Sequence, residues 1–522
     1  MTTMLKSYLC GTWMEGKGTP ASLVNPTTEE VVAHATTEGL DFKAGLDYAR
    51  AKGGNALREM NFAQRGEMLK AMSKVLHGAR EELLDLATET TGNTRSDAKF
   101  DVDGATFTLG FYARLGRELG ERSILLDGDE IALAKNPRFV GRHIYTPKLG
   151  VAVHINAFNF PAWGFAEKAA VALLAGMPVM TKPATSTAVL TVRMFEILAE
   201  SGCLPDGAVS LISGSAGDVL DHLTTQDVLA FTGSSNTATM LRNNANLVAN
   251  SVPINVEADS LNAAILGPDV DASSETYDLF LREVVRDMTQ KAGQKCTAIR
   301  RIFVPADRIE SVREDLCQEL SRMPVGNPLT REVKVGPLAT SNQLRDVKAG
   351  LSRLQESCKT VYGDGGRGDL VDIDHDRGFF LSPVLLQAER LDESVVHADE
   401  VFGPVATMLP YGGETAELCD GVMAGNGGLV SSVYSDDVPF VGEVLTQIAA
   451  GHGRLHLASA KIADASPGPG TVMPALLHGG PGRAGGGEEL GGARSLPFYM
   501  QRTAVQGSRR VLQKILDIPK GD

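Results

Sequence analysis

Cysteine is scarce in this sequence, and long apolar runs are absent. The six cysteines are scattered over 522 residues and none forms a CxxC pair, so neither a disulfide framework nor a zinc ribbon is indicated. The longest apolar run, residues 169–180, contains glycine and proline and is far shorter than the ~20 residues of a membrane-spanning helix. The N-terminal residues contain no apolar signal segment. We therefore expect a cytoplasmic protein without a membrane partner.

Positive charge is also in deficit. Lysine and arginine number 50 against 64 aspartates and glutamates, a formal net charge of -14, and such a chain lacks the basic surface on which nucleic-acid binding depends. Hydrophobic residues at 43% and charged residues at 22% match globular averages, which excludes wholesale disorder. The ten histidines show no metal-ligand spacing, so no metal is expected.

Glycine, in contrast, is abundant. The 56 glycines are about 11% of the chain, against ~7% in an average protein, so many backbone positions need a residue without a Cβ atom. Gly480, Gly482 and Gly485 match GxGxxG literally, but neither a preceding strand nor a following ribose-binding acid accompanies them. We therefore expect no dinucleotide fingerprint there.

Short apolar and β-branched runs alternate with helix-length stretches after residue 150, which is typical of βαβ units and a parallel sheet. The first series comprises residues 151–155, 177–180, 209–212, 228–231 and 254–256. The second series comprises residues 263–266, 302–304, 403–408 and 429–434. The predicted fold class is therefore α/β, with two or three domains in 522 residues.

Two other patterns lie outside these series. The apolar residues between positions 68 and 76 fall on one helical face, which predicts a single helix from soon after Phe62 through Glu82. Residues 138–145 and 497–505 alternate as strands do. These two segments fit either an arm that pairs between subunits or a peripheral hairpin.

One cysteine has a setting suited to chemistry. Cys296 lies in a glycine-containing segment with Lys291 and Lys295, and nearby cations and an accessible loop lower the pKa of a thiol. We expect this loop to enter a helix. The alternative is a cysteine that only packs, which is our interpretation of Cys317 and Cys419 within helical patterns.

Polar residues follow three predicted strands, at the ends where parallel sheets collect ligands. Glu257 offers a general base, or joins Asp259 and Ser260 in a helix N-cap cluster. Asn159 offers an amide to a developing oxyanion. Lys182 suits a ribose hydroxyl or a phosphate, and its alternative is an exposed lysine.

Six segments in one order resemble the NAD(P)-dependent aldehyde dehydrogenase superfamily over almost the whole chain. They are residues 156–161 (NAFNFP), 182–184 (KPA), 231–234 (FTGS), Glu257, residues 293–296 (GQKC) and residues 400–404 (EVFGP). Residues 153–161, 478–492 and 499–507 are similar in particular to the ring-cleavage subgroup of this family. The resemblance implies a Rossmann-like parallel-sheet cofactor domain, an α/β catalytic domain and a small β oligomerisation arm.

The resemblance also implies domain ranges and residue roles. The cofactor domain is expected at residues 1–135 and 150–258, the catalytic domain at 259–490, and the arm of a homodimer at 136–149 and 491–522. The implied catalytic residues are the nucleophile Cys296, the water-activating base Glu257, the oxyanion donor Asn159, and the proton-path residues Glu489 and Lys168. The implied cofactor-binding residues are Phe158, Lys182, Ala184, Thr185, Gly214, Gly233, Ser234, Glu400 and Phe402.

Departures from the family pattern bear on the cofactor. Thr185 stands where NAD-preferring members have an acid, so a 2′-phosphate is not repelled and Lys182 can pair with it. We therefore expect NADP, with NAD as a weaker cofactor. Ala238 replaces a glycine near the expected pyrophosphate contact, and residues 258–260 replace the usual Leu-Gly-Gly after the base.

The implied reaction is NADP-dependent oxidation of an aldehyde to a carboxylic acid in the degradation of aromatic compounds. The implied substrate is a CoA-linked semialdehyde. A CoA-acylating dehydrogenase is one alternative, although acylating relatives typically lack the glutamate at the position of Glu257. A non-catalytic binding or structural protein of the same fold is another, and the retained Cys296, Glu257 and Asn159 argue against it.

Overall fold

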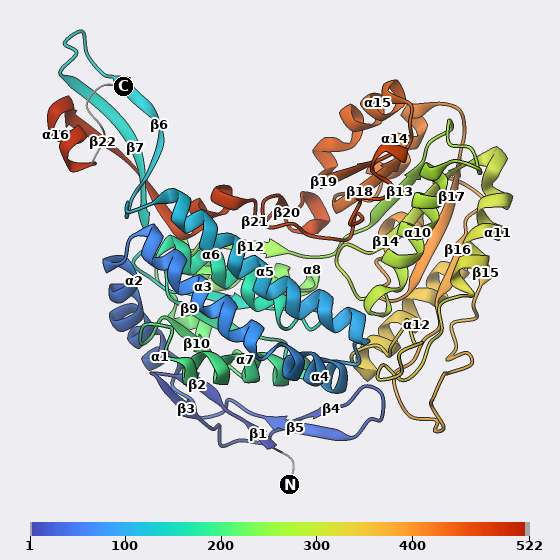
Figure 1. The fold of residues 1–522 in the computed structure, drawn as a ribbon, viewed down its shortest axis with the longest axis horizontal. Helices are drawn as coiled ribbons and strands as arrows, with labels where there is room; N and C mark the ends of the chain where they lie inside the picture. The colour runs from blue at the N-terminus through green and yellow to red at the C-terminus, as the bar shows by residue number, and fades with distance from the viewer. Residues whose placement is uncertain (1–2, 517–522) are drawn as a thin grey trace.

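Two seven-stranded sheets organise most of the chain. The computed structural model describes residues 3–516. Figure 1 shows the first sheet in the lower-left lobe, the second in the upper-right lobe, and an arm that extends from the first lobe. Within the described residues, no helix has the length and apolar character needed to span a membrane.

The first sheet has the strand order β12-β11-β8-β9-β10-β2-β3. Its parallel strands are β8 (Ala152–Ile155), β9 (Val179–Lys182), β10 (Val209–Leu211), β11 (Val228–Thr232) and β12 (Ile254–Glu257), and its antiparallel edge is formed by β2 (Ser7–Leu9) and β3 (Thr12–Met14). The first predicted series of strands is confirmed. Because these strands are parallel, the residues that follow them collect at one edge of the sheet.

Helices and a small sheet complete the first lobe. The helices are α1 (Phe42–Tyr48), α2 (Asn55–Glu59), α3 (Phe62–Gly78), α4 (Arg80–Thr91), α5 (Arg95–Leu119), α6 (Trp163–Ala175), α7 (Ala188–Ser201), α8 (Ser235–Arg242) and α9 (Ala245–Ala249). The small sheet has the order β1 (Thr3–Leu5), β5 (Val31–Ala35) and β4 (Ala21–Val24). α6 is buried along almost its whole length, which its alanine-rich sequence explains, since Glu167 and Lys168 are the only charged residues on this helix and pair with each other.

The predicted single helix from Phe62 through Glu82 is wrong. A capping box between Asn61 and Gln64 starts α3 as expected. At Ala79 the backbone has φ −99° and ψ 14°, so α3 ends and α4 begins as a separate helix. The apolar spacing continued across this break and therefore did not reveal it.

The second sheet has the strand order β15-β16-β17-β14-β13-β18-β19. Its strands are β13 (Asn262–Leu266), β14 (Ile299–Pro305), β15 (Lys359–Tyr362), β16 (Val384–Gln387), β17 (Val405–Tyr411), β18 (Gly428–Tyr434) and β19 (His452–Ala458), and only β15 is antiparallel to its neighbour. The accompanying helices are α10 (Glu275–Thr289), α11 (Ile309–Leu320), α12 (Ser341–Gln355), α13 (Ser394–Ala398), α14 (Thr415–Met423) and α15 (Val438–Ile448). The second predicted α/β layer is therefore confirmed.

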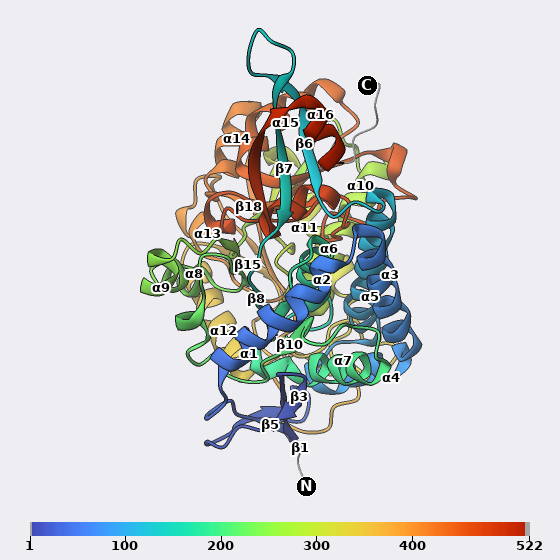
Figure 2. The same cartoon turned by 90° about the vertical axis from the view of Figure 1, so that its left-hand side faces the viewer.

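The arm is a three-stranded antiparallel sheet of order β22-β7-β6, and Figure 2 shows its strands side by side. β7 (Phe139–Pro147) pairs along its full length with β22 (Met500–Ser508), so the two segments predicted as strands do lie together. β6 (Leu125–Ala132) also belongs to this sheet, although our range placed it with the cofactor domain. α16 (Arg509–Ile515) follows β22. Of the predicted ranges, residues 1–2 and 517–522 lie outside the described residues, and the domain division stays a prediction.

The glycine-rich segment near the C-terminus forms a β-hairpin that contacts β12 of the first sheet. β20 (Leu477–Gly479) pairs with β21 (Glu488–Leu490), and His478 lies opposite Glu489. The amide of Gly487 donates to the carbonyl of Val256 at 3.1 Å. A Cβ atom on Gly487 would lie 2.4 Å from that same oxygen, so only glycine permits this close approach to β12.

Candidate active site

Cys296 lies in the loop between α10 and β14. The chain leaves α10 through a 3₁₀ turn, Gln290–Gly293, in which three successive residues have φ between 52° and 69°. A Cβ atom on Gly293 would lie 2.2 Å from the carbonyl oxygen of Gly403, so the turn requires glycine. The loop then enters a strand, so our expectation that it enters a helix is wrong.

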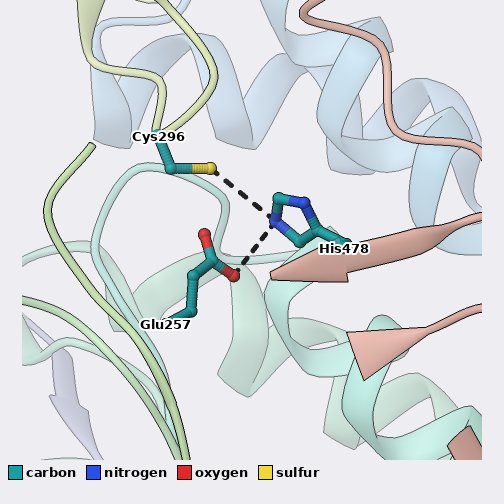
Figure 3. Close-up of side chains that lie close together, drawn as sticks. All are labelled: Glu257, Cys296 and His478. Carbon is teal, nitrogen blue, oxygen red and sulfur yellow. Dashed lines mark hydrogen bonds and ion pairs between the residues drawn. The ribbon is translucent and has the colours of Figure 1, made fainter. Parts of the chain in front are cut away.

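Two side chains from separate elements, Glu257 and His478, converge on the thiol of Cys296 (Figure 3). Glu257 is the last residue of β12, and His478 is the middle residue of β20. The His478 Nε2 atom lies 3.9 Å from Cys296 Sγ and 3.0 Å from Glu257 Oε2. Sequence analysis assigned no role to His478, because no local spacing links residues that are 182 positions apart.

The surroundings keep Glu257 ionised. Burial alone would raise the pKa of Glu257, but the His478 ring, followed by Lys168 and the thiol, favours the carboxylate and lowers that pKa to about 2. An ionised carboxylate beside a thiol is a proton acceptor. The arrangement can therefore perform general-base chemistry.

The thiol itself is not activated in the way that we expected. Burial raises the pKa of the Cys296 thiol well above its usual value, and the Glu257 carboxylate raises it further. Both neighbouring lysines point elsewhere: Lys295 Nζ lies 2.9 Å from a buried aspartate, and Lys291 Nζ lies 4.4 Å from the centre of the Phe160 ring. Deprotonation of the thiol therefore depends on a base, and Glu257 is in place to be that base.

A buried ion network lies beside this cluster. Lys168 Nζ, on α6, lies 2.6 Å from Glu167 Oε1 and 3.1 Å from Glu489 Oε2. Asn255 Nδ2 donates to Glu489 Oε1 at 3.0 Å. One oxygen from each of Glu167, Glu257 and Glu489 lies within 4.8 Å of the others. The structure thus brings the predicted pair Lys168 and Glu489 together, and adds Glu167, which the sequence analysis missed.

Asn159 lies in the loop between β8 and α6 and borders the same cavities as Cys296. Its Nδ2 atom donates to the carbonyl of Gln294 at 2.9 Å, which fixes the amide against the cysteine loop. An amide nitrogen carries two hydrogens. The second N–H can therefore donate to an oxyanion formed at the thiol.

A narrow pocket with aromatic walls also reaches Cys296. Its lining comprises Phe100, Gly104, Phe160, Trp163, Thr297, Gly470 and Val472. The Phe160 ring meets Phe100 and Trp163 edge to face, each with centroids 5.6 Å apart. Such packing gives the pocket a firm apolar wall suited to a carbon chain.

A larger cavity of about 510 Å³ borders Cys296 as well. From the predicted cofactor set it is lined by Phe158, Ala184, Gly233, Ser234, Glu400 and Phe402, and from the catalytic set by Asn159 and Glu257. Lys182, Thr185, Gly214, Lys168 and Glu489 are not among its lining residues. Asp259, Gln343 and Asp346 line it although the sequence analysis had not proposed them.

Lys182 and Thr185 are close in sequence to Ala184, which lines this cavity. Lys182 ends β9 and is partly buried, and burial lowers the pKa of its ammonium. Thr185 opens the 3₁₀ turn Thr185–Thr187 directly after Ala184, which lines the cavity.

The polar atoms of the larger cavity fit a dinucleotide. Among the described residues, Glu400 Oε1 and Thr232 Oγ1 are buried without a hydrogen-bond partner, so both can bond to ribose hydroxyls. Burial raises the pKa of Glu400 to about 8, against the effect of Arg300, whose Nε atom lies 3.9 Å away. Ser234 caps α8 by accepting from the amide of Thr237, so Ser234 places a hydroxyl beside the start of this helix.

The N-cap alternative for residues 257–260 is wrong, because a strand, β13, follows them instead of a helix. Asp259 Oδ1 accepts from the amide of Ser235 at 3.1 Å, at the start of α8. Ser260 Oγ donates to Asn262 Oδ1 at 2.6 Å. Glu257 is therefore left facing the thiol.

Comparison with known proteins defines the class. The chain belongs to the aldehyde dehydrogenase family, whose model matches residues 13–505. It is accordingly an oxidoreductase with aldehyde dehydrogenase activity, and the family resemblance seen in the sequence is confirmed. More particularly, it is 46% identical over 478 residues to a 3,4-dehydroadipyl-CoA semialdehyde dehydrogenase from Aromatoleum evansii. This alignment covers 91% of this chain and 93% of that protein. A betaine aldehyde dehydrogenase from Bacillus subtilis is 27% identical over 493 residues, 93% of this chain and 94% of that protein.

Solved structures agree on the fold. Lactaldehyde dehydrogenase from Escherichia coli superposes with a TM-score of 0.84 at 21% identity, covering 97% of this chain and 100% of that chain. Betaine aldehyde dehydrogenase from Staphylococcus aureus in complex with NAD+ superposes with a TM-score of 0.83 at 22% identity, covering 97% of this chain and 95% of that chain. The predicted α/β aldehyde dehydrogenase fold is confirmed.

Proposed function

We propose that this enzyme oxidises a CoA-linked semialdehyde, such as 3,4-dehydroadipyl-CoA semialdehyde, to the carboxylic acid with NADP. The observation that carries the proposal is the position of Cys296, beside Glu257, where two cavities meet. One cavity contains unpartnered polar atoms of Glu400 and Thr232 that fit a dinucleotide, and the other has aromatic walls that suit the carbon chain of an aldehyde. Both have access to the same sulfur atom.

Acylation begins with proton transfer. Glu257 accepts the thiol proton, because its carboxylate lies within 4.8 Å of Sγ. The Cys296 thiolate then adds to the aldehyde carbon and forms a thiohemiacetal. Asn159 and the backbone N–H of Cys296 donate to its oxyanion. When bound, the nicotinamide provides the acceptor for the hydride, and a thioester remains on Cys296.

Deacylation uses Glu257 a second time. The proton that it took from the thiol leaves through the neighbouring carboxylates of Glu167 and Glu489, with Lys168 between them. The restored carboxylate then removes a proton from water, which attacks the thioester and releases the acid. The contact of His478 Nε2 with Glu257 Oε2, at 3.0 Å, keeps Glu257 oriented toward the sulfur.

The cofactor residues divide by the part of the dinucleotide that they would hold. Phe158, Glu400 and Phe402 would flank the nicotinamide and its ribose, Gly233 and Ser234 the pyrophosphate, and Lys182, Ala184, Thr185 and Gly214 the adenosine. Thr185 brings no carboxylate to the 2′-position, so a phosphate there is not repelled and Lys182 can pair with it. NADP is thus the proposed cofactor, and NAD a weaker one.

The CoA-linked substrate and its place in aromatic degradation rest on the likeness to the relative from Aromatoleum evansii. The reaction with water is favoured over CoA acylation because Glu257 is present, ionised and adjacent to the thiol. A non-catalytic role is disfavoured, because nucleophile, base and amide all border the same cavities.

We further propose a homodimer of cytoplasmic subunits. β22 is an edge strand of the arm and β19 is an edge strand of the second sheet, so the arm of one copy can extend the sheet of another. All six cysteines are free thiols, as a reducing compartment allows.

Isotope labelling tests the reaction. Purified full-length enzyme is incubated with a semialdehyde and NADP in H₂¹⁸O without free CoA, and the acid is analysed by mass spectrometry. We expect ¹⁸O in the carboxylate, and a Glu257→Gln variant in which both the first formation of NADPH and steady-state turnover are about 10²–10⁴-fold slower, because Glu257 is the proposed base in acylation and in deacylation. A requirement for free CoA, together with an unchanged rate in Glu257→Gln, would establish the acylating alternative instead.

A further inference from the structure

Three ligand atoms of different chemistry converge on one point in the site. A thiol sulfur, a carboxylate oxygen and an imidazole nitrogen, from Cys296, Glu257 and His478, all lie within 4.8 Å of one another. The side chains of His478 and Glu257 are 1% and 2% exposed, whereas three cavities border Cys296. Sulfur, nitrogen and oxygen are the donors that bind Zn²⁺ in proteins.

The use of one imidazole nitrogen distinguishes this cluster from a proton relay. In a nucleophile–histidine–carboxylate relay, the nucleophile and the carboxylate contact different ring nitrogens. Here Nε2 of His478 faces both groups, 3.9 Å from Sγ and 3.0 Å from Oε2 (Figure 3). The three ligand atoms therefore surround one volume, in which a single cation would contact all of them.

Two of the three separations lie near those of tetrahedral coordination. Bonds of about 2.3 Å to sulfur and about 2.0–2.1 Å to nitrogen and oxygen place sulfur and nitrogen about 3.6 Å apart, and nitrogen and oxygen about 3.4 Å apart. The distances of 3.9 Å and 3.0 Å differ from these values by a few tenths of an ångström. Small side-chain rotations accommodate such differences.

Neighbouring groups hold the three ligands in place. The His478 ring packs edge to face against Trp163, with centroids 5.6 Å apart. Asn262 Nδ2 donates to the carbonyl of Cys296 at 2.8 Å, and sheet pairing fixes Glu257 at the end of β12. Ligands oriented in this way bind a metal without a large ordering cost.

We propose that Cys296, Glu257 and His478 form a reversible Zn²⁺ site that inhibits the enzyme. Binding replaces the S–H bond by an S–Zn bond and releases the proton to solvent, with no change of oxidation state. Water from the adjoining cavities supplies the fourth ligand. The bound metal occupies the nucleophile and the base together, so catalysis stops until a chelator removes it. Sequence spacing predicted no metal, because the ligands come from three distant segments.

Direct metal binding tests the site without using turnover. Reduced, metal-free full-length enzyme is dialysed against ZnCl₂, and bound metal is measured by atomic spectroscopy. We expect one tightly held Zn²⁺ per chain, proton release on binding, and protection of Cys296 from iodoacetamide. With Co²⁺ as the probe, we expect a sulfur-to-cobalt charge-transfer band and the visible spectrum of a tetrahedral ion.

Variants assign the ligands. His478→Phe, His478→Asn and Cys296→Ser should each weaken Zn²⁺ binding ~100-fold, and Cys296→Ser should abolish the charge-transfer band. His222→Phe is the matched control, because His222 Nε2 lies 3.0 Å from Asp218 in an exposed pair; we expect it to bind Zn²⁺ like the wild type. Unchanged Zn²⁺ affinity in both His478 variants, or a wild-type Co²⁺ spectrum without the sulfur band, would overturn the proposal. Neither measurement depends on substrate or NADP, so failure of the proposed oxidation would be seen separately.

Discussion

The Nε2 atom of His478 lies 3.0 Å from the Oε2 atom of Glu257. This contact joins the end of a strand in the first sheet to the glycine-rich hairpin β20–β21. Since Glu489 lies opposite His478 in that hairpin, the same pair of strands also supplies the carboxylate that contacts Lys168. One hairpin therefore influences both the proposed base and the proposed proton path.

Replacing His478 by phenylalanine should raise the pKa of Glu257, because the ring that favours its carboxylate is lost while its burial remains. The folded pKa is depressed to about 2 in the wild type, so the stabilisation by ionised Glu257 is present above the unfolded value of 4.5 and is lost as the pH falls toward 2. We expect the acidic limb of the pH profile of kcat to move upward by at least about one pH unit.

The control is His456→Phe, which removes a ring 3.3 Å from Glu283, a carboxylate that contacts neither Cys296 nor Glu257. It should leave the acidic limb in place. Steady-state kinetics across acidic and neutral pH, with melting curves for both variants, make the comparison. An acidic limb that stays fixed in His478→Phe would contradict the role given to this ring.

Replacing Glu257 by glutamine should make Cys296 easier to alkylate in the free enzyme. Burial and the Glu257 carboxylate both raise the pKa of the Cys296 thiol. A neutral amide at position 257 removes the effect of the carboxylate and leaves the effect of burial, so the thiol pKa should fall. We expect the rate of iodoacetamide labelling, measured against pH by mass spectrometry of the Cys296 peptide, to rise at lower pH than in the wild type. Labelling of Cys419, a buried thiol on α14 that lines none of the cavities bordering Cys296, serves as the internal control and should not change. The same variant should turn over substrate slowly. Faster alkylation with slower turnover would show that the reactivity of the thiol does not by itself set the rate of catalysis.

The local sequence pattern was sufficient to predict the strands and the site residues that directly follow or end them, because these features depend on residues that are neighbours in the chain. Each parallel strand bearing a proposed site residue is an apolar run of a few residues, and Glu257, Asn159 and Lys182 follow or end such runs. Their collection at one edge follows from parallel pairing alone. The family resemblance added the roles, and the fold that it implied is confirmed.

Contacts between distant segments were not predictable in the same way. His478 reaches Cys296 across 182 residues because a hairpin crosses between sheets. Lys295 and Lys291 flank Cys296 in sequence, but a left-handed turn directs both side chains into other contacts. The break between α3 and α4 depends on backbone angles at Ala79, which apolar spacing does not report.

Replacing Gly293 by alanine should lower the free energy of unfolding for two reasons, namely the positive φ at this position and a clash of the added Cβ atom with the Gly403 carbonyl. The φ of 69° costs an L-residue about 1–2 kcal/mol, and the added Cβ atom would lie 2.2 Å from the Gly403 carbonyl. Gly202 is the matched control, since its φ is 64° and a Cβ atom added there would meet nothing within 4 Å. We expect Gly202→Ala to lower the free energy of unfolding by about 1 kcal/mol with normal activity, and Gly293→Ala by about 3 kcal/mol with most activity lost. Denaturant unfolding and turnover rates are measured for both variants. Equal losses of unfolding free energy in the two variants would show that the loop moves and relieves the clash with Gly403.

Replacing Lys168 by methionine should destabilise the fold by about 3–5 kcal/mol, because it leaves the buried carboxylates of Glu167 and Glu489 without their cation. Lys43→Met is the control, because the pair of Lys43 with Asp47 is 65% and 51% exposed and should contribute less than about 0.5 kcal/mol. Chemical denaturation of both variants gives the comparison. The Lys168 variant should also slow thioester hydrolysis relative to the first turnover. A loss no larger than that of Lys43→Met would mean that the buried carboxylates are already protonated.

Replacing Thr185 by glutamate should reverse the cofactor preference. Thr185 follows Ala184, which lines the dinucleotide-sized cavity, and a carboxylate there would repel a 2′-phosphate while accepting hydrogen bonds from a ribose. Thr185→Gln has nearly the same size without the charge and isolates the electrostatic part. We expect kcat/KM for NADP to fall about 10²-fold in Thr185→Glu, that for NAD to rise, and Thr185→Gln to resemble the wild type. If the two variants change the NADP to NAD ratio equally, the preference arises from shape. If neither changes it, the adenosine does not reach Thr185, and Lys182 must be tested as the phosphate contact by itself.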